Sequence, residues 1–307
     1  MNTTPVVSPV PPMVSRACSL FLRSPAKAAE RLAAGSRTAV YRVAVHDGPR
    51  VIVKLYSHTA RRNALTEATA IRAVSAAVPV PRVLGYGTTS SAGATALITS
   101  DLGLDTLGSA VRSGSVPRSQ ALRDLGTLLG RMHEAPVPDT VHHSLVVESI
   151  ASLGRRCPPA VLDRLAPALS VITSAPHDGE SAVWCHGDPH LENVVLAGAR
   201  QTRHLVDFTD AAPGRREADL AHALVMTDAH SQWDRHALLG AYPYALSDAH
   251  LSAWTAFLMV RCWAHACPGN ERTIWSARLA DLSRRTPHLF RPDAGHSPAP
   301  HARRRAR

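Results

Sequence analysis

Lysine is the residue that this sequence most clearly lacks. Among its 307 residues there are 34 lysines and arginines, and only Lys27 and Lys54 are lysines, which leaves 32 arginines. A guanidinium is a planar fork of five donors, whereas an ammonium is a compact point charge, so the two cannot replace each other at every site. A lysine kept against this background indicates a position that needs a compact charge.

Cysteine is also scarce, and no C-x-x-C pair occurs. The five cysteines are Cys18, Cys157, Cys185, Cys262 and Cys267. An odd, scattered set excludes a disulfide framework and predicts a reduced, cytoplasmic setting. No apolar run is long enough to span a membrane. Residues 1–12 contain no basic residue, unlike a secretory signal, and residues 1–16 are expected to form a disordered lead-in.

Two common nucleotide-binding signatures are missing. No G-x-x-x-x-G-K-[ST] run occurs, which excludes the P-loop. Gly85 and Gly87 are not followed by a third glycine, so they do not form a dinucleotide fingerprint.

The positive charge is concentrated at one end. Of the formal net charge of +10, five arginines and one aspartate in residues 291–307 contribute +4. Such a tail could contact nucleic acid or anionic lipid. The aromatic content of 5% and the lack of a recognisable nucleic-acid-binding module favour a solvated, disordered tail instead. We therefore expect no specific nucleic acid and no membrane as partners.

The most informative stretch contains two carboxylates and an amide. Asp188 lies five positions before Asn193, and two apolar runs follow at residues 194–196 and 204–206, a pattern that predicts a β-hairpin. The hairpin would bring Asn193, at its start, close to Asp207, at its end. Hard oxygen ligands of this kind suit Mg²⁺ held jointly with nucleotide phosphates, and they leave one carboxylate free to accept a hydroxyl proton.

A zinc site at Cys185, His186 and His190 is the competing interpretation. The two histidines are four positions apart, but Pro189 between them disfavours the helix that would place both rings on one face. We therefore expect His186 to brace the loop by hydrogen bonds.

The run His186-Gly187-Asp188-x-x-x-x-Asn193, followed by Val206-Asp207-Phe208, resembles a known pair of motifs. It is similar to the catalytic loop and metal-binding segment of the aminoglycoside phosphotransferase and choline kinase group, which shares the protein-kinase-like fold. In protein kinases these segments read H-R-D-x-x-x-x-N and D-F-G. Here Thr209 stands where the glycine would be.

The resemblance covers about residues 30–290 and implies an α+β fold of two lobes. A small antiparallel-sheet lobe that binds the nucleotide is expected over residues 17–100. A mostly helical lobe with the catalytic loop and the acceptor site is expected over residues 101–290. The basic tail, residues 291–307, lies outside the resemblance.

The resemblance also implies the chemistry, which is transfer of the γ-phosphoryl group of ATP or GTP to a hydroxyl of a small molecule, with Mg²⁺ as cofactor. In this scheme Asp188 orients and accepts the hydroxyl proton, Asn193 and Asp207 hold Mg²⁺, and Lys54 holds the α and β phosphates with support from Glu67. Asp210 and His190 are candidates for the acceptor pocket.

The residue pattern around Lys54 agrees with this scheme. Residues 39–45 and 50–56 alternate and are rich in β-branched side chains, which predicts two strands joined by a turn. Helix 62–77 would carry Glu67 on its apolar face, where an acid is unfavourable unless it is paired. Lys54 is the expected partner. Further strands are predicted over 83–87 and 94–99, and a short helix over 17–34.

Three residues are expected to contact the nucleotide through the backbone. Ser36 lies in a small-residue turn whose N–H groups can reach phosphate oxygens. Ser100 and Leu102 lie in the segment that the resemblance identifies as the hinge, where the backbone would meet the base.

The second half of the chain has the pattern of helices. A helix is predicted over 119–134, with Ser119 as N-cap and His133 in a structural role. Asp219 suits a family element in which an aspartate caps a helix and ties it to the catalytic loop. Helices are expected over 219–230, 248–266 and 270–285.

Charge balance bears on the acceptor, which the resemblance places mainly against residues after Asp207. Residues 208–290 contain eight acidic residues and eight arginines. Cationic aminoglycosides need carboxylates to pair their ammonium groups. The balance therefore predicts an acceptor with at most one or two positive charges, such as a less cationic antibiotic or a natural-product intermediate. A metabolite kinase of the choline, homoserine or sugar type and a catalytically degenerate binding protein stay open, as does a monomer or a homodimer.

Overall fold

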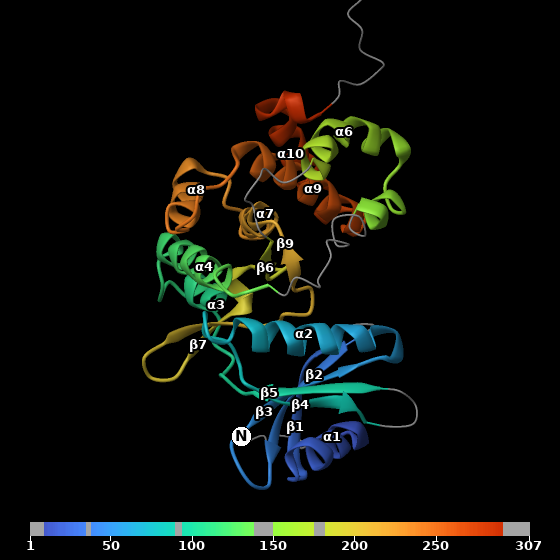
Figure 1. Ribbon diagram of the computed structural model, residues 1–307, viewed down its shortest axis with the longest axis vertical. Helices are drawn as coiled ribbons and strands as arrows, with labels where there is room; N and C mark the ends of the chain where they lie inside the picture. Colours follow the sequence, from blue (N-terminus) through green and yellow to red (C-terminus); the bar gives the residue numbers. More distant parts are fainter. Residues whose placement is uncertain (1–8, 35–37, 90–93, 138–149, 175–181, 291–307) are drawn as a thin grey trace, which may run out of the picture. The chain divides into compact units, whose positions relative to one another are not determined.

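The computed structural model describes residues 9–34, 38–89, 94–137, 150–174 and 182–290 (Figure 1). The chain divides into two compact units, Met1–His143 with Glu180–Leu246 and Ser144–Gly179 with Ser247–Arg307. The lobe boundary predicted after residue 100 falls inside the first unit, and the predicted lobes stay a prediction. Ser36, the first half of the predicted lead-in (residues 1–8) and the basic tail lie outside the described residues.

The first unit begins with a five-stranded antiparallel sheet of strand order β1-β2-β3-β5-β4. The strands are β1 (Ala26–Ala34), β2 (Thr38–Val45), β3 (Val51–Tyr56), β4 (Val83–Thr88) and β5 (Thr95–Ser100). Lys54 lies in the central strand β3, opposite Val40 of β2 and Leu97 of β5. The small antiparallel sheet predicted for the N-terminal part is confirmed.

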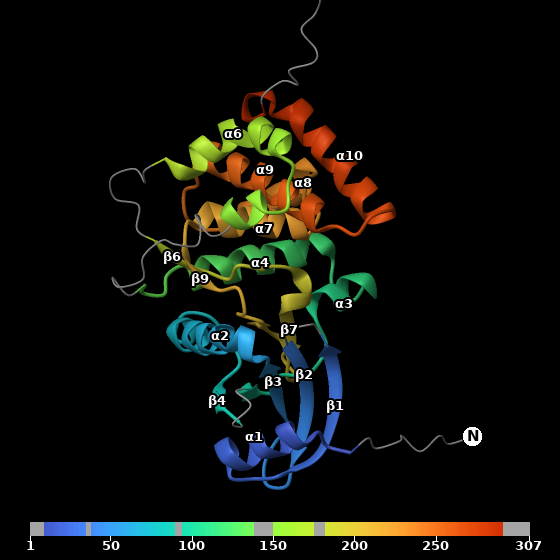
Figure 2. The ribbon, with the colours of Figure 1, turned by 90° about the vertical axis from the view of Figure 1, so that its right-hand side faces the viewer.

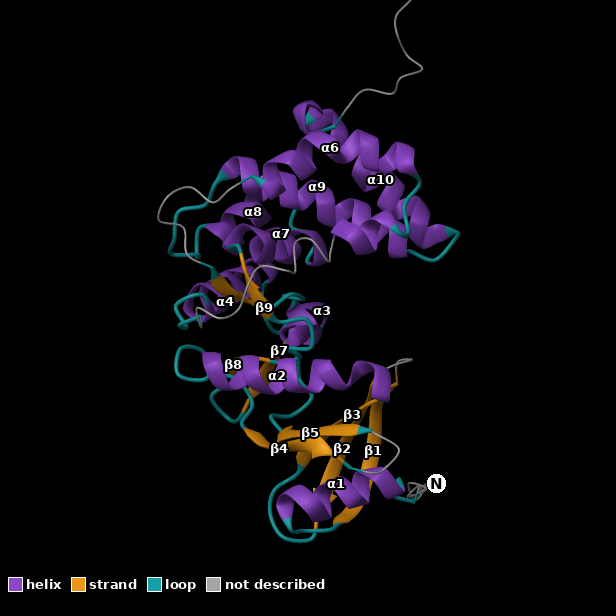
Figure 3. Ribbon diagram, turned by 45° about the vertical axis from the view of Figure 1, so that its right-hand side comes forward, coloured by secondary structure: helices purple, strands orange, loops and turns teal. Residues whose placement is uncertain are grey.

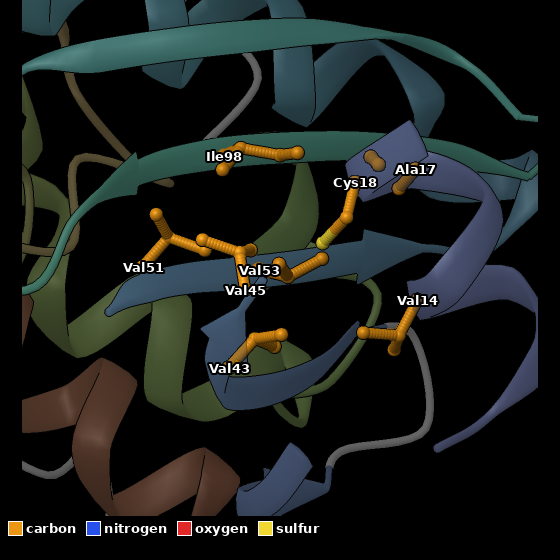
Figure 4. Packing of buried hydrophobic residues seen from close by; sticks show 9 residues of the cluster. Val14, Ala17, Cys18, Val43, Val45, Val51, Val53 and Ile98 are labelled. Carbon is orange, nitrogen blue, oxygen red and sulfur yellow. The ribbon is translucent and has the colours of Figure 1, made fainter. Parts of the chain in front are cut away.

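A helix packs on each face of this sheet (Figure 2). Helix α1 (Pro12–Leu22) covers one face, where Val53 and Ile98 join a buried cluster that includes Val14 and Cys18 (Figure 4). Helix α2 (Arg61–Val74), preceded by the 3₁₀ turn η1 (His58–Ala60), covers the other. There Tyr56 and Leu97 pack with alanines of α2. Side chains alternate between the two faces along a strand, so Lys54 shares the α2 face with Tyr56.

The helix predicted over residues 17–34 is wrong. The helix starts earlier, at Pro12, which also lies within the predicted lead-in, and it ends at Leu22; residues 26–34 form β1. The alanine-rich sequence of β1 has high helix propensity, but pairing with the whole length of β2 overrides that preference.

The rest of the first unit carries the catalytic stretch. The hairpin predicted after Asn193 is confirmed as β7 (Val194–Ala197) and β8 (Thr202–Leu205), with Val194 opposite Leu205. Strand β6 (Val183–Cys185) pairs with β9 (Ala212–Gly214), and η2 (Leu191–Asn193) leads into β7. The helices are α3 (Leu107–Arg112), α4 (Arg118–Met132), α7 (Arg216–Met226) and α8 (Gln232–Leu239).

Two predicted helix caps differ from the structure. Helix α4 has Pro117 at its N-cap without a side-chain hydrogen bond, so Ser119 lies inside the first turn and is not the cap. Helix α7 begins at Arg216, so Asp219 lies within its first turn and is not the cap.

The second unit is helical (Figure 3). Its main elements are α6 (Pro159–Thr173), α9 (Asp248–His265), α10 (Asn270–Arg285) and η3 (Pro287–Leu289). Helix α9 packs against both α6 and α10 and is buried over most of its length. None of the helices in the described ranges has the length and apolar character needed to cross a membrane.

We expect Gly85→Ala to destabilise the sheet. A Cβ at Gly85 would lie 2.6 Å from Cβ of Phe21 on α1, and both atoms are fixed close to the backbone. Overpacking of this kind costs about 1–3 kcal/mol, which calorimetry would detect as a lower melting temperature. Gly154→Ala is the matched control, because its added Cβ would meet only Leu162 Cδ1 at 3.9 Å. Equal melting temperatures for both variants would contradict the packing of α1 on β4.

Candidate active site

The loop between β6 and β7 holds Asp188 and Asn193 in one compact turn. The amide Nδ2 of Asn193 donates to the backbone carbonyl of Asp188 at 2.9 Å and lies 3.4 Å from Asp188 Oδ2. Because the NH₂ group of Asn193 is turned to Asp188, its carbonyl oxygen is left as the group able to bind a cation. The backbone N–H of Val206 donates to the backbone carbonyl of Asn193 at 3.0 Å, and this bond ties the loop to the segment that leads to Asp207.

Gly187 is required by this turn. Its φ is +81°, in the left-handed region. A Cβ at this position would lie 2.1 Å from the backbone oxygen of Asp210. The close approach places Asp210, a predicted acceptor residue, beside the catalytic loop.

Asp219 anchors the loop from helix α7. Its carboxylate accepts the backbone N–H groups of His186 at 2.9 Å and Gly187 at 3.0 Å. It also lies 3.1 Å from His133 Nε2, and His133 Nδ1 lies 2.7 Å from the Tyr242 hydroxyl. Burial raises the pKa of Asp219, but the hydrogen bonds and charge of its partners outweigh this and lower it. The predicted tie to the catalytic loop and the structural role of His133 are therefore both seen.

His186 braces the loop from inside, as the sequence predicted. It is fully buried, its Nε2 lies 2.9 Å from the backbone oxygen of Val206, and its ring packs on Phe208. Cys185 lies close to His133 and Asp219, with ligand atoms within 4.8 Å of one another. Each of these three groups already has a protein hydrogen-bond partner, and burial raises the pKa of the Cys185 thiol, which favours a structural role for the cluster.

Lys54 lies between two carboxylates. Its Nζ is 2.7 Å from Glu67 Oε1 and 2.8 Å from Asp207 Oδ1. Burial lowers the pKa of Lys54, but the two carboxylates outweigh this effect and raise it. Glu67 is only 1% exposed, so the pairing expected from its place on the apolar face of the helix is present.

Asp207 adopts an unusual backbone conformation. Its φ of +62° lies in the left-handed region, which aspartate tolerates better than most residues. Burial raises the pKa of its carboxyl, but Lys54 and the hydroxyl of Thr209 outweigh this and lower it to about 2. Asp207 is therefore ionised at neutral pH. Its carboxylate and the amide oxygen of Asn193 form a hard oxygen donor set that fits Mg²⁺.

Two histidines flank Asp188. His190 Nε2 lies 3.4 Å from Oδ2, and His222 Nε2 lies 3.7 Å from Oδ1. Burial raises the pKa of Asp188, but the hydrogen bond and charge of His190, with help from His222 and His186, lower it overall. Sequence analysis missed His222. Its position three residues after Asp219 on the same helix face was the available signal.

The predicted hinge lies between β5 and α3. Ser100 Oγ accepts the backbone N–H of Arg82 at 2.9 Å, so its side chain secures the end of the sheet. Asp101 accepts Arg42 Nε at 2.6 Å and the backbone N–H of Gly103 at 2.9 Å, which fixes the turn around Leu102.

Comparison with known proteins agrees with this geometry. Residues 28–257 match the model of the phosphotransferase enzyme family. This chain belongs to that family. The match begins after α1, so the helix on the outer face of the sheet precedes the matched region. No curated relative matches the sequence.

The fold is shared with solved phosphotransferases. A thermostable aminoglycoside phosphotransferase mutant in a ternary complex with ADP and hygromycin B has 14% identity and a TM-score of 0.61, over 87% of this chain and 96% of the other. An aminoglycoside 2'-phosphotransferase in complex with GDP has 15% identity and a TM-score of 0.62, over 88% and 97%. A choline/ethanolamine kinase family protein from Mesorhizobium loti has 18% identity and a TM-score of 0.59, over 85% and 90%. The expected protein-kinase-like fold and family are thus confirmed.

We expect the Asp188–His190 pair to make stability depend on pH. Burial lowers the pKa of His190, but the hydrogen bond and charge of Asp188 raise it above 6.5. A raised folded pKa contributes stability that is complete below 6.5 and is lost as the pH rises through the folded value. Wild-type protein should therefore exceed His190→Gln in stability by more at pH ~5.5 than at pH ~9.

Denaturant unfolding at the two pH values measures this difference. His58→Gln is the control, because His58 is exposed and has no carboxylate partner among the residues that the structure describes. If the wild type exceeded His190→Gln in free energy of unfolding by more at the higher pH than at the lower, the ion pair would be contradicted.

Proposed function

We propose that this protein transfers the γ-phosphoryl group of ATP or GTP to a hydroxyl of a small molecule, with Mg²⁺ as cofactor. The observation that supports this most strongly is the ammonium of Lys54, held between Glu67 and Asp207 at 2.7 and 2.8 Å. Asp188 and Asn193 lie on the adjoining loop of the same compact unit. The structural neighbours in complex with ADP and GDP support nucleotide binding.

Asp188 acts on the acceptor in this proposal. Its lowered pKa keeps the carboxylate ionised at neutral pH, so it can accept a hydrogen bond from the attacking hydroxyl and orient the oxygen. The oxygen forms a bond to the γ-phosphorus while the bond to the bridging oxygen of the diphosphate breaks, and the hydroxyl proton passes to Asp188. His190 and His222 hold the carboxylate during this step, and Asp210 and His190 face the acceptor.

Lys54, Asn193 and Asp207 act on the donor. An ammonium has three protons, and two of those of Lys54 are directed at Glu67 and Asp207, so one remains for the α and β phosphates. Asn193 and Asp207 would hold Mg²⁺, which neutralises phosphate charge when bound. The backbone around Ser100 and Leu102 contacts the nucleotide base. A cytoplasmic location fits the five cysteines, all of which are free.

The acceptor is proposed to carry at most one or two positive charges. Of the eight acids between 208 and 290, Glu217 and Asp219 are buried. Asp234 is paired with Arg118, and Asp281 with two arginines of α10. Few carboxylates are left to pair a polycation, so a macrolide, a nucleoside or peptide antibiotic, or a metabolite alcohol fits better than an aminoglycoside.

A screen of purified protein with ATP or GTP and Mg²⁺ against these classes tests both proposals. We expect transfer to a weakly charged alcohol and little transfer to kanamycin. Efficient phosphorylation of kanamycin with a micromolar KM would overturn the charge argument. Absence of nucleotide binding would overturn the phosphotransferase proposal and favour the degenerate binding protein.

Asp188→Ala should abolish transfer and leave nucleotide binding nearly intact. Loss of the group that orients and accepts the hydroxyl proton lowers the rate by about 10²–10⁴-fold. Calorimetric titration with the nucleotide measures binding separately. A collapse of nucleotide affinity in this variant would contradict the division of roles.

Lys54→Arg should impair turnover although it conserves the charge. The planar guanidinium cannot occupy the narrow space between Glu67 and Asp207 and still direct a donor at the phosphates. Steady-state kinetics with the acceptor found in the screen measure the loss, and Lys27→Arg is the matched control, since the other lysine lies on the exposed edge strand β1. Wild-type turnover in Lys54→Arg would show that this lysine does not contact phosphate.

A further inference from the structure

Thr209 occupies the position of the glycine in the protein-kinase D-F-G segment, and its hydroxyl reaches two carboxylates. Oγ1 lies 2.6 Å from Asp207 Oδ1 and 3.1 Å from Glu67 Oε2. A glycine could make neither contact. The side chain therefore links the segment proposed to bind metal to helix α2.

Tyr56 supplies a second hydroxyl to the same group. It lies at the end of β3, is 1% exposed, and donates to Glu67 Oε2. Burial and the neighbouring charge of Glu67 raise the pKa of the phenol, so it stays protonated and remains a donor. Both oxygens of Glu67 are thus engaged, Oε1 by Lys54 and Oε2 by the hydroxyl of Tyr56, with the hydroxyl oxygen of Thr209 3.1 Å from the same Oε2.

The donors are distributed unevenly over Asp207. Oδ1 receives both Lys54 and Thr209, whereas no contact described for Oδ2 fills its lone pairs. A hydroxyl has a single proton, and the shorter contact directs that of Thr209 to Asp207. Because Oδ1 already accepts from two donors, Oδ2 is the oxygen left to bind a cation.

We propose that Thr209 and Tyr56 are positioning residues, which fix the carboxylates of Asp207 and Glu67 so that Lys54 keeps one proton for phosphate and Asp207 keeps one oxygen for Mg²⁺. This inference rests on the proposed phosphotransferase function. In this chain the hydroxyl of Thr209 supplies contacts that a glycine at the same position could not make.

Thr209→Val removes the hydroxyl and keeps the shape of the side chain. Binding of ADP is titrated calorimetrically with Mg²⁺ and again with EDTA. We expect affinity for ADP with Mg²⁺ to fall by about 3–30-fold, because a hydrogen bond to a partly exposed charged group is lost. Affinity without metal should change by less than about 3-fold, since Lys54 is retained.

Two variants separate positioning from general damage. Thr209→Ser restores the hydroxyl and should recover wild-type affinity. Thr227→Val is the matched control, because the hydroxyl of this buried threonine donates only to the carbonyl of Ala223 in its own helix. If Thr209→Val does not fold, Thr209→Gly takes its place with the same expected weakening.

Tyr56→Phe completes a double-mutant cycle. Thr209→Val leaves the hydroxyl of Tyr56 as the donor to Glu67 Oε2. Tyr56→Phe leaves only the hydroxyl of Thr209, whose single proton both carboxylates then share, and the double variant leaves this buried carboxylate oxygen with no donor. The double variant should therefore lose more affinity with Mg²⁺ than the product of the single losses predicts. If the loss of affinity in the double variant equals the product of the two single losses, the two hydroxyls do not share a role at Glu67.

The outcomes distinguish this inference from the function on which it rests. If wild-type protein binds no nucleotide, the phosphotransferase proposal fails. If wild-type protein binds ADP with Mg²⁺ and Thr209→Val binds it equally well, the function stands and the positioning role of Thr209 is overturned. An equal loss with and without metal would also overturn it, because Asp207 would then not be the group that Thr209 positions.

Discussion

The pairing of the Lys54 ammonium with the carboxylates of Glu67 and Asp207 is the interaction on which the proposed donor site depends. It joins three pieces of chain: strand β3, helix α2 and the segment after the β7–β8 hairpin, the last of them 153 residues away in sequence. One positive charge is shared by two carboxylates, so this cluster has a net negative charge. Removing the ammonium of Lys54 would leave two uncompensated carboxylates in a poorly solvated place, which costs more than the pairing contributes when intact. The sheet, helix α2 and the segment around Asp207 are therefore held together by electrostatics as well as by packing.

Asp219 has the corresponding role for the catalytic loop. It is buried and holds two successive backbone N–H groups, and a backbone held in this way cannot relax when a ligand arrives. Two tasks are thus separated in this chain. Buried charged residues fix the backbone, and the proposed chemistry is left to the partly exposed Asp188 and Asp207 and to the buried amide of Asn193. Preorganisation of this kind suits phosphoryl transfer, where positioning and charge account for most of the catalysis.

Much of this arrangement could be predicted from the sequence, because around Lys54, Glu67 and the β7–β8 hairpin the local residue patterns match the secondary structure of the fold. The scarcity of lysine and the helical period together identified Lys54 and Glu67 as partners, and alternation identified the hairpin that brings Asn193 to Asp207. Strand β1 was missed because its alanines favour a helix and only the open edge of β2 makes it a strand. His222 was missed because no motif includes it, and the contact arises only when α7 docks on the loop. The acceptor and the lobe boundary need information that residue patterns do not contain.

The absent side chain of Gly187 has a consequence for how this gene can vary. A Cβ there would meet the Asp210 carbonyl at 2.1 Å, and φ is +81°. Every amino acid that one nucleotide change can reach from a glycine codon carries a Cβ. No single substitution at position 187 is therefore compatible with this loop, whichever acceptor is under selection. New specificities must arise at neighbouring positions, such as Asp210, which meets Gly187 through its backbone oxygen, an atom that every amino acid at that position supplies.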